Sequence, residues 1–355
     1  MIQSVFRAFA TNPEEMALKN KISKGVIRLY GALLKRICGA VMALLLCVVA
    51  AGASDMSAAR SLIPVGHTVG VKLFSRGVMV VKLTDGGTPA RNGGLRTGDV
   101  ILQCGGTPVT SAEQFQSLLQ EDKSADLRVS RNGGEVTIRV EPERNEDGVC
   151  QIGAWIRDSM AGIGTLTWYD PESGKFGALG HGVMDADTGL LMPFQDGAIL
   201  PSTVKAVKKG ERGSAGELRG DFDLTRDLGP LYANTDWGVF GTLDAESAAA
   251  FAGEAMPIGT PAVGPARILS NVRGDEVKSY AIEITRLLPD SGDGRDMEIS
   301  VTDPALLSQT GGIVQGMSGS PIIQNGGFVG AVTHVLLQDP SKGYGIGIET
   351  MLAAM

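Results

Sequence analysis

The chain has 355 residues, of which 43% are hydrophobic, 20% charged and 5% aromatic, and 49 are glycines. We therefore expect two folded domains plus an accessory segment, rich in tight turns, and exclude a largely disordered chain. The first 53 residues carry a charge of +5 against a total of −7, which leaves −12 on the remaining 302. Because binding to phosphates needs clustered Lys and Arg, this acidic body excludes nucleic acid as a partner.

An uncharged, mostly apolar segment at 37–54 follows a basic leader that contains Lys19, Lys21, Lys24, Arg28, Lys35 and Arg36. Positive flanks hold an N-terminus in the cytoplasm, so residues 1–54 are predicted to be a leader plus a signal or transmembrane helix. We expect the rest to be exported across the cytoplasmic membrane or anchored in it. An apolar core of about 17 residues is short for a stable membrane span and long for the apolar region of a signal peptide. Both a cleaved signal peptide and a membrane anchor therefore stay open.

The four cysteines do not form a disulfide framework. Cys38 and Cys47 lie in the hydrophobic segment, which leaves Cys104 and Cys150 in the exported part. These two could form one disulfide, although two thiols are the favoured prediction. The sequence has no Cys-x-x-Cys motif or Cys/His cluster, so we expect neither a metal nor another cofactor.

The region 65–140 is predicted to be a compact unit of short strands at 68–74, 77–82, 99–104, 126–131 and 135–140. One helix interrupts them. Ser111 and Gln114 have the spacing of a capping box, and Phe115, Leu118 and Leu119 form an apolar face.

This unit resembles a PDZ domain. The matching residues are Ala90-Arg91-Asn92-Gly93-Gly94-Leu95, Gly98-Asp99-Val100-Ile101-Leu102 and the helix that follows. The resemblance implies a peptide-binding groove between a strand and the helix, lined by Val69, Gly70, Val71 and Phe115. Because His67-Thr68-Val69-Gly70-Val71 replaces the usual carboxylate-binding loop, we do not expect binding of free C-termini. The alternative is that this PDZ-like unit serves only as a packing and spacing module.

After a charged linker at 141–148, residues 149–355 are predicted to form an all-β domain. Short β-type runs alternate with Gly, Asp and Pro turns, and the larger apolar residues of 280–285 occupy every second position, as on a half-buried strand. No long amphipathic helix is evident, which disfavours an α/β-hydrolase fold.

The run Gly316-Met317-Ser318-Gly319-Ser320-Pro321 has the residues that a serine nucleophile needs. Flanking glycines permit a tight turn, in which the amides of Gly316 and Ser318 can point at one oxyanion beside the Ser318 hydroxyl. Such a run is also common in ordinary turns, so the nucleophile needs a base nearby.

Only three histidines are available as that base. His67 falls in the PDZ-like unit, and His334 lies in a predicted strand at 330–335, where a structural role is preferred. His181 ends a short apolar run and is flanked by Gly180 and Gly182, which suits a closely approached catalytic imidazole. From the pattern alone, a structural role stays open for His181 as well.

A set of motifs along the chain resembles the SpoIVB peptidases, the stage IV sporulation protein B family. They are Gly177-Ala178-Leu179-Gly180-His181-Gly182, Asp185-Ala186-Asp187-Thr188-Gly189, Val301-Thr302-Asp303-Pro304, and the runs at 310–321, 330–335 and 343–346. The resemblance implies a mainly β chain: a membrane or signal helix, a PDZ-like domain at 65–140 and a chymotrypsin-like double β-barrel at 149–355.

The resemblance also implies a serine endopeptidase in which His181 is the general base, Asp303 the orienting acid and Ser318 the nucleophile. Asp303 precedes Ser318 by only 15 residues, whereas chymotrypsin-type enzymes place their acid much farther upstream. The competing carboxylates are Asp185, Asp187 and Asp236.

By the same resemblance, the peptidase cleaves its own N-terminal segment and a regulator of a membrane-embedded metalloprotease. It does so in the forespore intermembrane space during sporulation, which triggers sigma-factor activation. A non-catalytic PDZ scaffold with a degenerate protease-like domain is the alternative, and an esterase with the same triad is a weaker one. The acidic run at 185–189 could bind a metal, although it is too short for an EF-hand and a tight turn is preferred.

Overall fold

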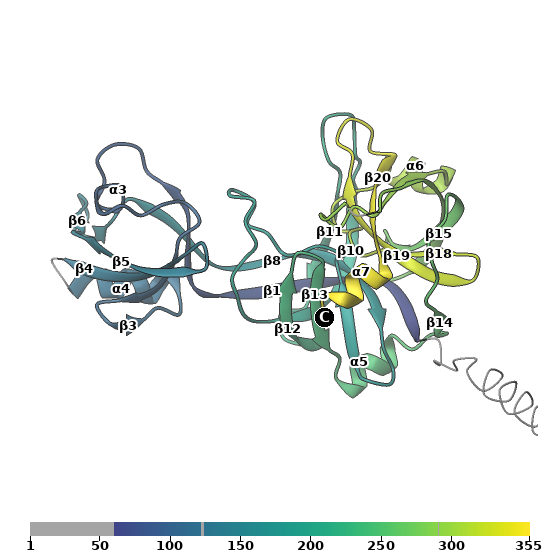
Figure 1. The fold of residues 1–355 in the computed structure, drawn as a ribbon, viewed down its shortest axis with the longest axis horizontal. Helices are drawn as coiled ribbons and strands as arrows, with labels where there is room; N and C mark the ends of the chain where they lie inside the picture. Colours follow the sequence, from purple (N-terminus) through teal and green to yellow (C-terminus); the bar gives the residue numbers. More distant parts are fainter. Residues whose placement is uncertain (1–59, 122–123, 290) are drawn as a thin grey trace, which may run out of the picture. The chain divides into compact units, whose positions relative to one another are not determined.

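The computed structural model describes residues 60–121, 124–289 and 291–355 (Figure 1). The predicted leader and signal or transmembrane helix at 1–54, together with Cys38 and Cys47, therefore lies outside the described residues. Within the described residues, no helix has the length and hydropathy needed to cross a membrane.

The first barrel is built on the 23-residue strand β1 (Ser61–Leu83). The first half of β1 pairs with β8 (Ala154–Tyr169) on one side and with β10 (Phe194–Lys208) on the other. The strands β9 (Lys175–Ala178), β13 (Gly238–Thr242) and β12 (Gly229–Thr235) connect β8 back to β10, which closes a ring of six strands. A further strand, β11 (Glu217–Phe222), pairs with β10.

The second barrel is closed by six antiparallel strands. In pairing order they are β15 (Gly264–Asn271), β16 (Val277–Leu287), β17 (Met297–Val301), β20 (Lys342–Gly347), β19 (Gly327–Val335) and β18 (Pro321–Gln324). Tyr280, Ile282 and Ile284 of β16 face its core while the residues between them are exposed, as the alternation predicted. The two rings agree with the predicted mainly β fold with a double barrel.

Four short elements complete the region of the two barrels. They are α5 (Ala245–Ala250), β14 (Met256–Pro257), α6 (Pro304–Thr310) and α7 (Ile348–Ala353).

The PDZ-like unit is formed around the second half of β1. Its elements are α3 (Pro89–Gly93), β2 (Val100–Cys104), β3 (Thr107–Pro108), α4 (Ala112–Glu121), β4 (Ala125–Arg131), β5 (Gly134–Val140), β6 (Glu143–Arg144) and β7 (Cys150–Gln151). The Ser111 hydroxyl accepts from the Gln114 amide at 3.1 Å, which confirms the predicted N-cap of the helix. The Gln114 side chain, however, accepts from the amide of Thr110 instead of returning to Ser111. Cys104 and Cys150 are both buried and no disulfide joins them, in agreement with the favoured prediction.

The predicted start of the PDZ-like domain at residue 65 needs correction. The strand β1 continues from the first barrel into the PDZ-like unit, and β8 returns along it, with Phe74 opposite Ser159 and Leu83 opposite Ala154 (Figure 1). The PDZ-like unit is therefore an insertion between two neighbouring strands of the first barrel. Gly66 and Gly77 both adopt positive φ within the continuous strand.

The predicted peptide groove needs correction for the same reason. Val69 lies opposite Gly164 of β8 and Pro201 of β10, so both hydrogen-bonding edges of β1 are occupied at Val69, Gly70 and Val71. A peptide cannot add to a strand that has no free edge. Phe115 is 1% exposed in the core of the PDZ-like unit.

The insertion predicts how two deletions differ. Replacing residues 76–157 with an Asn-Gly turn should leave a barrel that unfolds cooperatively, because 61–75 and 158–169 still pair as a hairpin. Deleting 60–140 removes β1 and should abolish the native near-UV circular dichroism. Equal loss of that signal in both proteins would contradict the insertion.

Candidate active site

Ser318 lies in a turn between α6 and β18 that contacts both barrels. The Gly319 amide donates to Val332 O of β19 at 2.7 Å, and the Ser320 amide donates to Met317 O at 2.9 Å. Gly316 and Gly319 have φ of +97° and +95°, and a Cβ at Gly319 would come within 2.3 Å of Thr165 O. The glycines on either side of Ser318 are thus required by the turn and by its close approach to β8.

Thr165 of β8 holds this turn from the first barrel. Its amide donates to Ser318 O at 3.0 Å and its hydroxyl donates to Gly316 O at 2.8 Å. Its own carbonyl accepts the Leu179 amide at 3.1 Å, two residues before His181. Sequence reasoning missed Thr165, because a threonine in a strand carries no signal for this role.

The amides predicted for the oxyanion site are those of Gly316 and Ser318. Within the described part of the chain, neither the Gly316 amide nor the Ser318 amide donates a hydrogen bond. Thr165 binds the carbonyls of both residues, which holds Gly316 and Ser318 in the turn. Both amides are therefore available in the turn that carries Ser318, as stabilisation of an oxyanion requires.

His181 follows β9 through a distorted backbone. Leu179 and Gly180 have φ of +70° and +69°, and a positive φ is uncommon for a buried leucine. A Cβ at Gly180 would lie 3.0 Å from the Thr333 methyl group of β19, so the two barrels approach closely here.

The environment of His181 favours a neutral ring. Its Nδ1 lies 2.8 Å from Gly182 O. Burial lowers the pKa of His181, and the backbone hydrogen bond to Gly182 opposes that shift. With Nδ1 donating to Gly182 O, Nε2 carries a lone pair that can accept a proton.

The structure brings Ser318 and His181 to one place together with a second histidine. The Ser318 hydroxyl donates to Thr333 O at 2.8 Å. The next residue, His334, has its ring centroid 5.4 Å from that of His181. No hydrogen bond joins Ser318 to His181 among the described residues, so the hydroxyl must leave Thr333 before it can donate to His181.

Asp303 lies elsewhere in the second barrel. It is the N-cap of α6, and its carboxylate accepts from the amides of Ala305, Leu306 and Ala281 at 2.9, 3.0 and 3.3 Å. Among the described residues, no hydrogen bond or ion pair joins Asp303 to a histidine. Its role as orienting acid stays a prediction from the resemblance, and its contacts support helix capping.

The SpoIVB peptidase S55 family model matches residues 148–352 of the chain, and a PDZ domain model matches residues 80–131. The chain belongs to the SpoIVB peptidase S55 family. This confirms the resemblance seen in the sequence motifs, and family membership supports a serine peptidase. No curated protein matches the chain.

Solved structures show partial similarity to this S55 family member. The PDZ domain of the SdrC-like protein from Listeria monocytogenes is 19% identical, covering 23% of this chain and 87% of its own, with a TM-score of 0.21. The active form of the Rv3671c protease from M. tuberculosis is 13% identical over 56% of this chain and 73% of its own, with a TM-score of 0.30. Its inactive form is 14% identical over 55% and 82%, with a TM-score of 0.29.

The other acidic candidates in the S55 domain have structural partners or face solvent. Asp185 is fully buried and accepts from the amides of Asp187 and Thr188, which confirms the predicted tight turn. Asp185 and Asp187 both pair with Arg157 of β8. Asp236 is exposed in the turn between β12 and β13. Within the described ranges, no group of three or more His, Cys, Asp or Glu side chains could hold a metal.

His334 has an unusual environment for a histidine of the S55 domain. Its Nδ1 is buried and has no hydrogen-bond partner within the described residues. Burial lowers its pKa to about 4, assisted by the nearby charges of His181 and Arg295 and opposed by Asp293. Sequence reasoning preferred a structural role for His334, because nothing in a strand pattern indicates that it faces His181.

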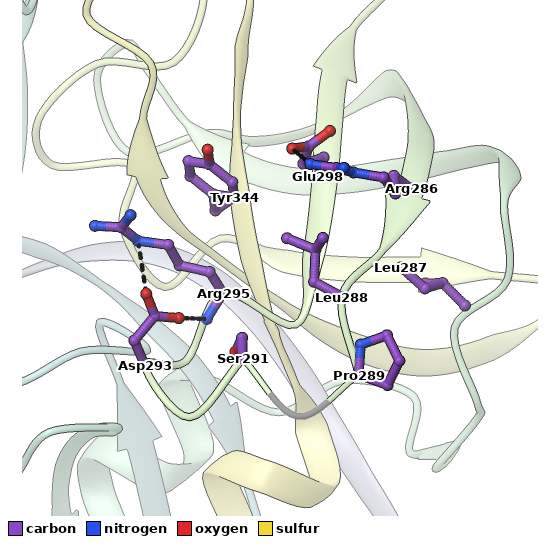
Figure 2. A pocket seen from close by; sticks show the side chains of 9 residues that line it. All are labelled: Arg286, Leu287, Leu288, Pro289, Ser291, Asp293, Arg295, Glu298 and Tyr344. Atoms are coloured by element: carbon purple, nitrogen blue, oxygen red, sulfur yellow. Dashed lines mark hydrogen bonds and ion pairs between the residues drawn. The ribbon is translucent and has the colours of Figure 1, made fainter.

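A pocket of about 470 Å³ lies beside Tyr344 of β20 (Figure 2). Tyr344, which lines it, is opposite His334 in the pairing of β19 with β20. Figure 2 shows its charged residues paired with each other: Arg286 with Glu298, and Arg295 with Asp293. The Arg295 guanidinium also lies 5.1 Å from the Tyr344 ring centroid.

The position of Asp303 predicts different effects for two substitutions. Asp303→Ala should lower the free energy of unfolding by about 1 kcal/mol, because three amides lose their acceptor, whereas Asp303→Asn retains a good N-cap. If Asp303 only caps α6, the Asn protein should keep both its stability and its activity, measured by denaturant unfolding and peptide hydrolysis. A loss on the order of 10⁴-fold in kcat with stability unchanged would identify Asp303 as the orienting acid after all.

The lowered pKa of His334 predicts a pH dependence of stability. The unfolded chain binds a proton at this histidine below pH 6.5, whereas the folded protein does so only near pH 4. The free energy of unfolding should therefore decrease as pH falls through this window. Denaturant unfolding of His334→Phe should show a smaller loss than the unsubstituted protein. An identical pH dependence in the two proteins would contradict the buried neutral imidazole.

Proposed function

We propose that the chain is a serine endopeptidase in which Ser318 attacks the substrate carbonyl and His181 accepts its proton. The observation that carries this proposal is the double attachment of Thr165 to the turn around Ser318, next to the segment that leads to His181. This attachment supports a site in which a hydroxyl, an imidazole and two amides from two barrels act together. Family membership supports the same chemistry.

Each group has a role in the reaction that follows from its contacts. Ser318 rotates away from Thr333 O, passes its proton to Nε2 of His181 and forms a bond to the carbonyl carbon. The amides of Gly316 and Ser318 bind the oxyanion, while Gly182 O holds the Nδ1 proton and keeps the ring in the reactive tautomer. His181 then protonates the leaving amine, and later removes a proton from the water that releases the acyl group.

The substrates we propose are protein segments. They are the chain's own N-terminal segment and a regulator of a membrane-embedded metalloprotease, cleaved in the intermembrane space during sporulation to trigger sigma-factor activation. Family membership supports this biology, and the basic leader before the apolar segment at 37–54 supports export or membrane anchoring.

A fluorophosphonate probe tests the nucleophile directly. Ser318→Ala should abolish labelling, self-cleavage and peptide hydrolysis, with a loss on the order of 10⁶-fold in kcat, because no other hydroxyl occupies its place. Ser320→Ala is the matched control two residues away, since Ser320 is fully buried and bonded to the Ser270 hydroxyl.

Two outcomes would contradict the proposal. Labelling that persists in Ser318→Ala and disappears in Ser320→Ala would show that Ser320, and not Ser318, is the nucleophile. A protein that is never labelled and whose cellular function survives Ser318→Ala would be the non-catalytic scaffold.

A further inference from the structure

The strand β8 has one hydrogen-bonding edge that is only partly used. On one side, β8 pairs with β1 along most of its length. On the other side, it pairs with β9 only from Leu166 on. Within the described parts of the chain, residues 159–163 of β8 therefore have a partner strand on the β1 side and none on the opposite side.

The hydrogen bonds of Thr165 show which backbone groups lie on this open edge. Its amide donates to Ser318 O and its carbonyl accepts the Leu179 amide, so both groups point away from β1. Groups that face one edge of a strand recur at every second residue, and no register shift interrupts the pairing of β8 with β1 between Val69 and Phe74. The amide and carbonyl of Ile163 therefore point to the same side as those of Thr165.

The surroundings of this edge leave room for a peptide. Ala161 and Gly162 are exposed, and a Cβ at Gly162 would have no atom of the described chain within 4 Å. The Ile163 side chain is half-buried, and its Cγ2 lies 3.2 Å from the position that a Cβ at Gly316 would take. The open edge thus starts beside the turn that carries Ser318.

The position of His181 indicates which half of a substrate runs along this edge. His181 follows β9, the neighbour of β8 in the first barrel. As the proposed base, His181 gives its proton to the leaving amine, so the chain after the scissile bond passes on the side of the first barrel. The first residue of that chain supplies the amine. The second residue is the first whose N–H and C=O are both free to pair with Ile163.

We propose that the edge of β8 at residues 161–163 binds the substrate segment that follows the scissile bond, as an added antiparallel strand. The inference deepens the proposed function and rests on the roles of Ser318 and His181. Ile163 O accepts the N–H of the second residue after the bond, and the Ile163 amide donates to the C=O of that residue. The substrates are therefore extended protein segments with at least two residues beyond the bond. Proline is excluded from the second position, because it has no N–H.

Changes in the substrate test this pairing with the unsubstituted protein. The probe is a peptide that spans the self-cleavage site, which is located by sequencing the new N-terminus. Replacing the N–H of the second residue after the bond by an ester oxygen should lower kcat/KM by about 10-fold, as expected for the loss of one hydrogen bond. The same replacement at the third residue should change kcat/KM less than about 2-fold, because that N–H points away from β8. Equal effects at the two positions would overturn the proposal.

Two substitutions test the same pairing from the side of the protein. Ile163→Pro removes the amide on the open edge and leaves the pairing with β1 intact, whereas Ile163→Ala keeps that amide and removes the packing against Gly316. Two substrates share the residues before the scissile bond, but one leaves as a peptide and the other as nitroaniline. We expect the ratio of their kcat/KM values, peptide to nitroanilide, to fall by about 10-fold in the Pro protein. In the Ala protein, a loss caused by packing affects both substrates and leaves the ratio unchanged.

The outcomes separate this inference from the proposed function. An unchanged ratio in a folded Pro protein overturns the role of the β8 edge, while hydrolysis by Ser318 stands. If the Pro protein does not fold, the two ester peptides decide the question. If the unsubstituted protein hydrolyses neither substrate and is not labelled by the fluorophosphonate, the proposed function itself fails.

Discussion

Three hydrogen bonds made by one residue hold the candidate active site together. Thr165 donates its amide to Ser318 O and its hydroxyl to Gly316 O, and it accepts the Leu179 amide with its own carbonyl. Because Thr165 is fully buried, these bonds are not weakened by exchange with water. Thr165, a residue of the first barrel, thus fixes the position of the nucleophile turn of the second barrel. It also fixes the position of the strand that leads to His181.

The sequence predicted the parts of this arrangement that depend on local chemistry. The glycines around Ser318 and His181 made both residues candidates, since a tight turn or close approach shows directly as glycine in the sequence, and the family resemblance then assigned their roles. The alternation in 280–285 also located a strand with one buried face correctly. Family motifs then gave the identity of the domain, which the S55 match confirms.

What the sequence could not show depends on contacts between distant segments. Asp303 precedes Pro304, and the same two residues suit a helix N-cap as well as they suit a catalytic acid. Val69 to Val71 lie before PDZ motifs in the chain, yet their pairing partners are about 95 and 130 residues later, in β8 and β10. Thr165 and His334 gave no signal, because the partner of each lies in another part of the chain.

The path of β1 also has a consequence for the order in which the protein can fold. Phe74 and Ser159 are neighbours in the first barrel but are separated by 85 residues of chain, so closing that loop directly would carry a large entropic cost. The PDZ-like unit contains its own hydrophobic core and can form before the barrel does. Once it has formed, the two chain segments leave it side by side, and the distant pairing becomes a local one. The insertion can thus act as an internal nucleus that assembles the first barrel during synthesis.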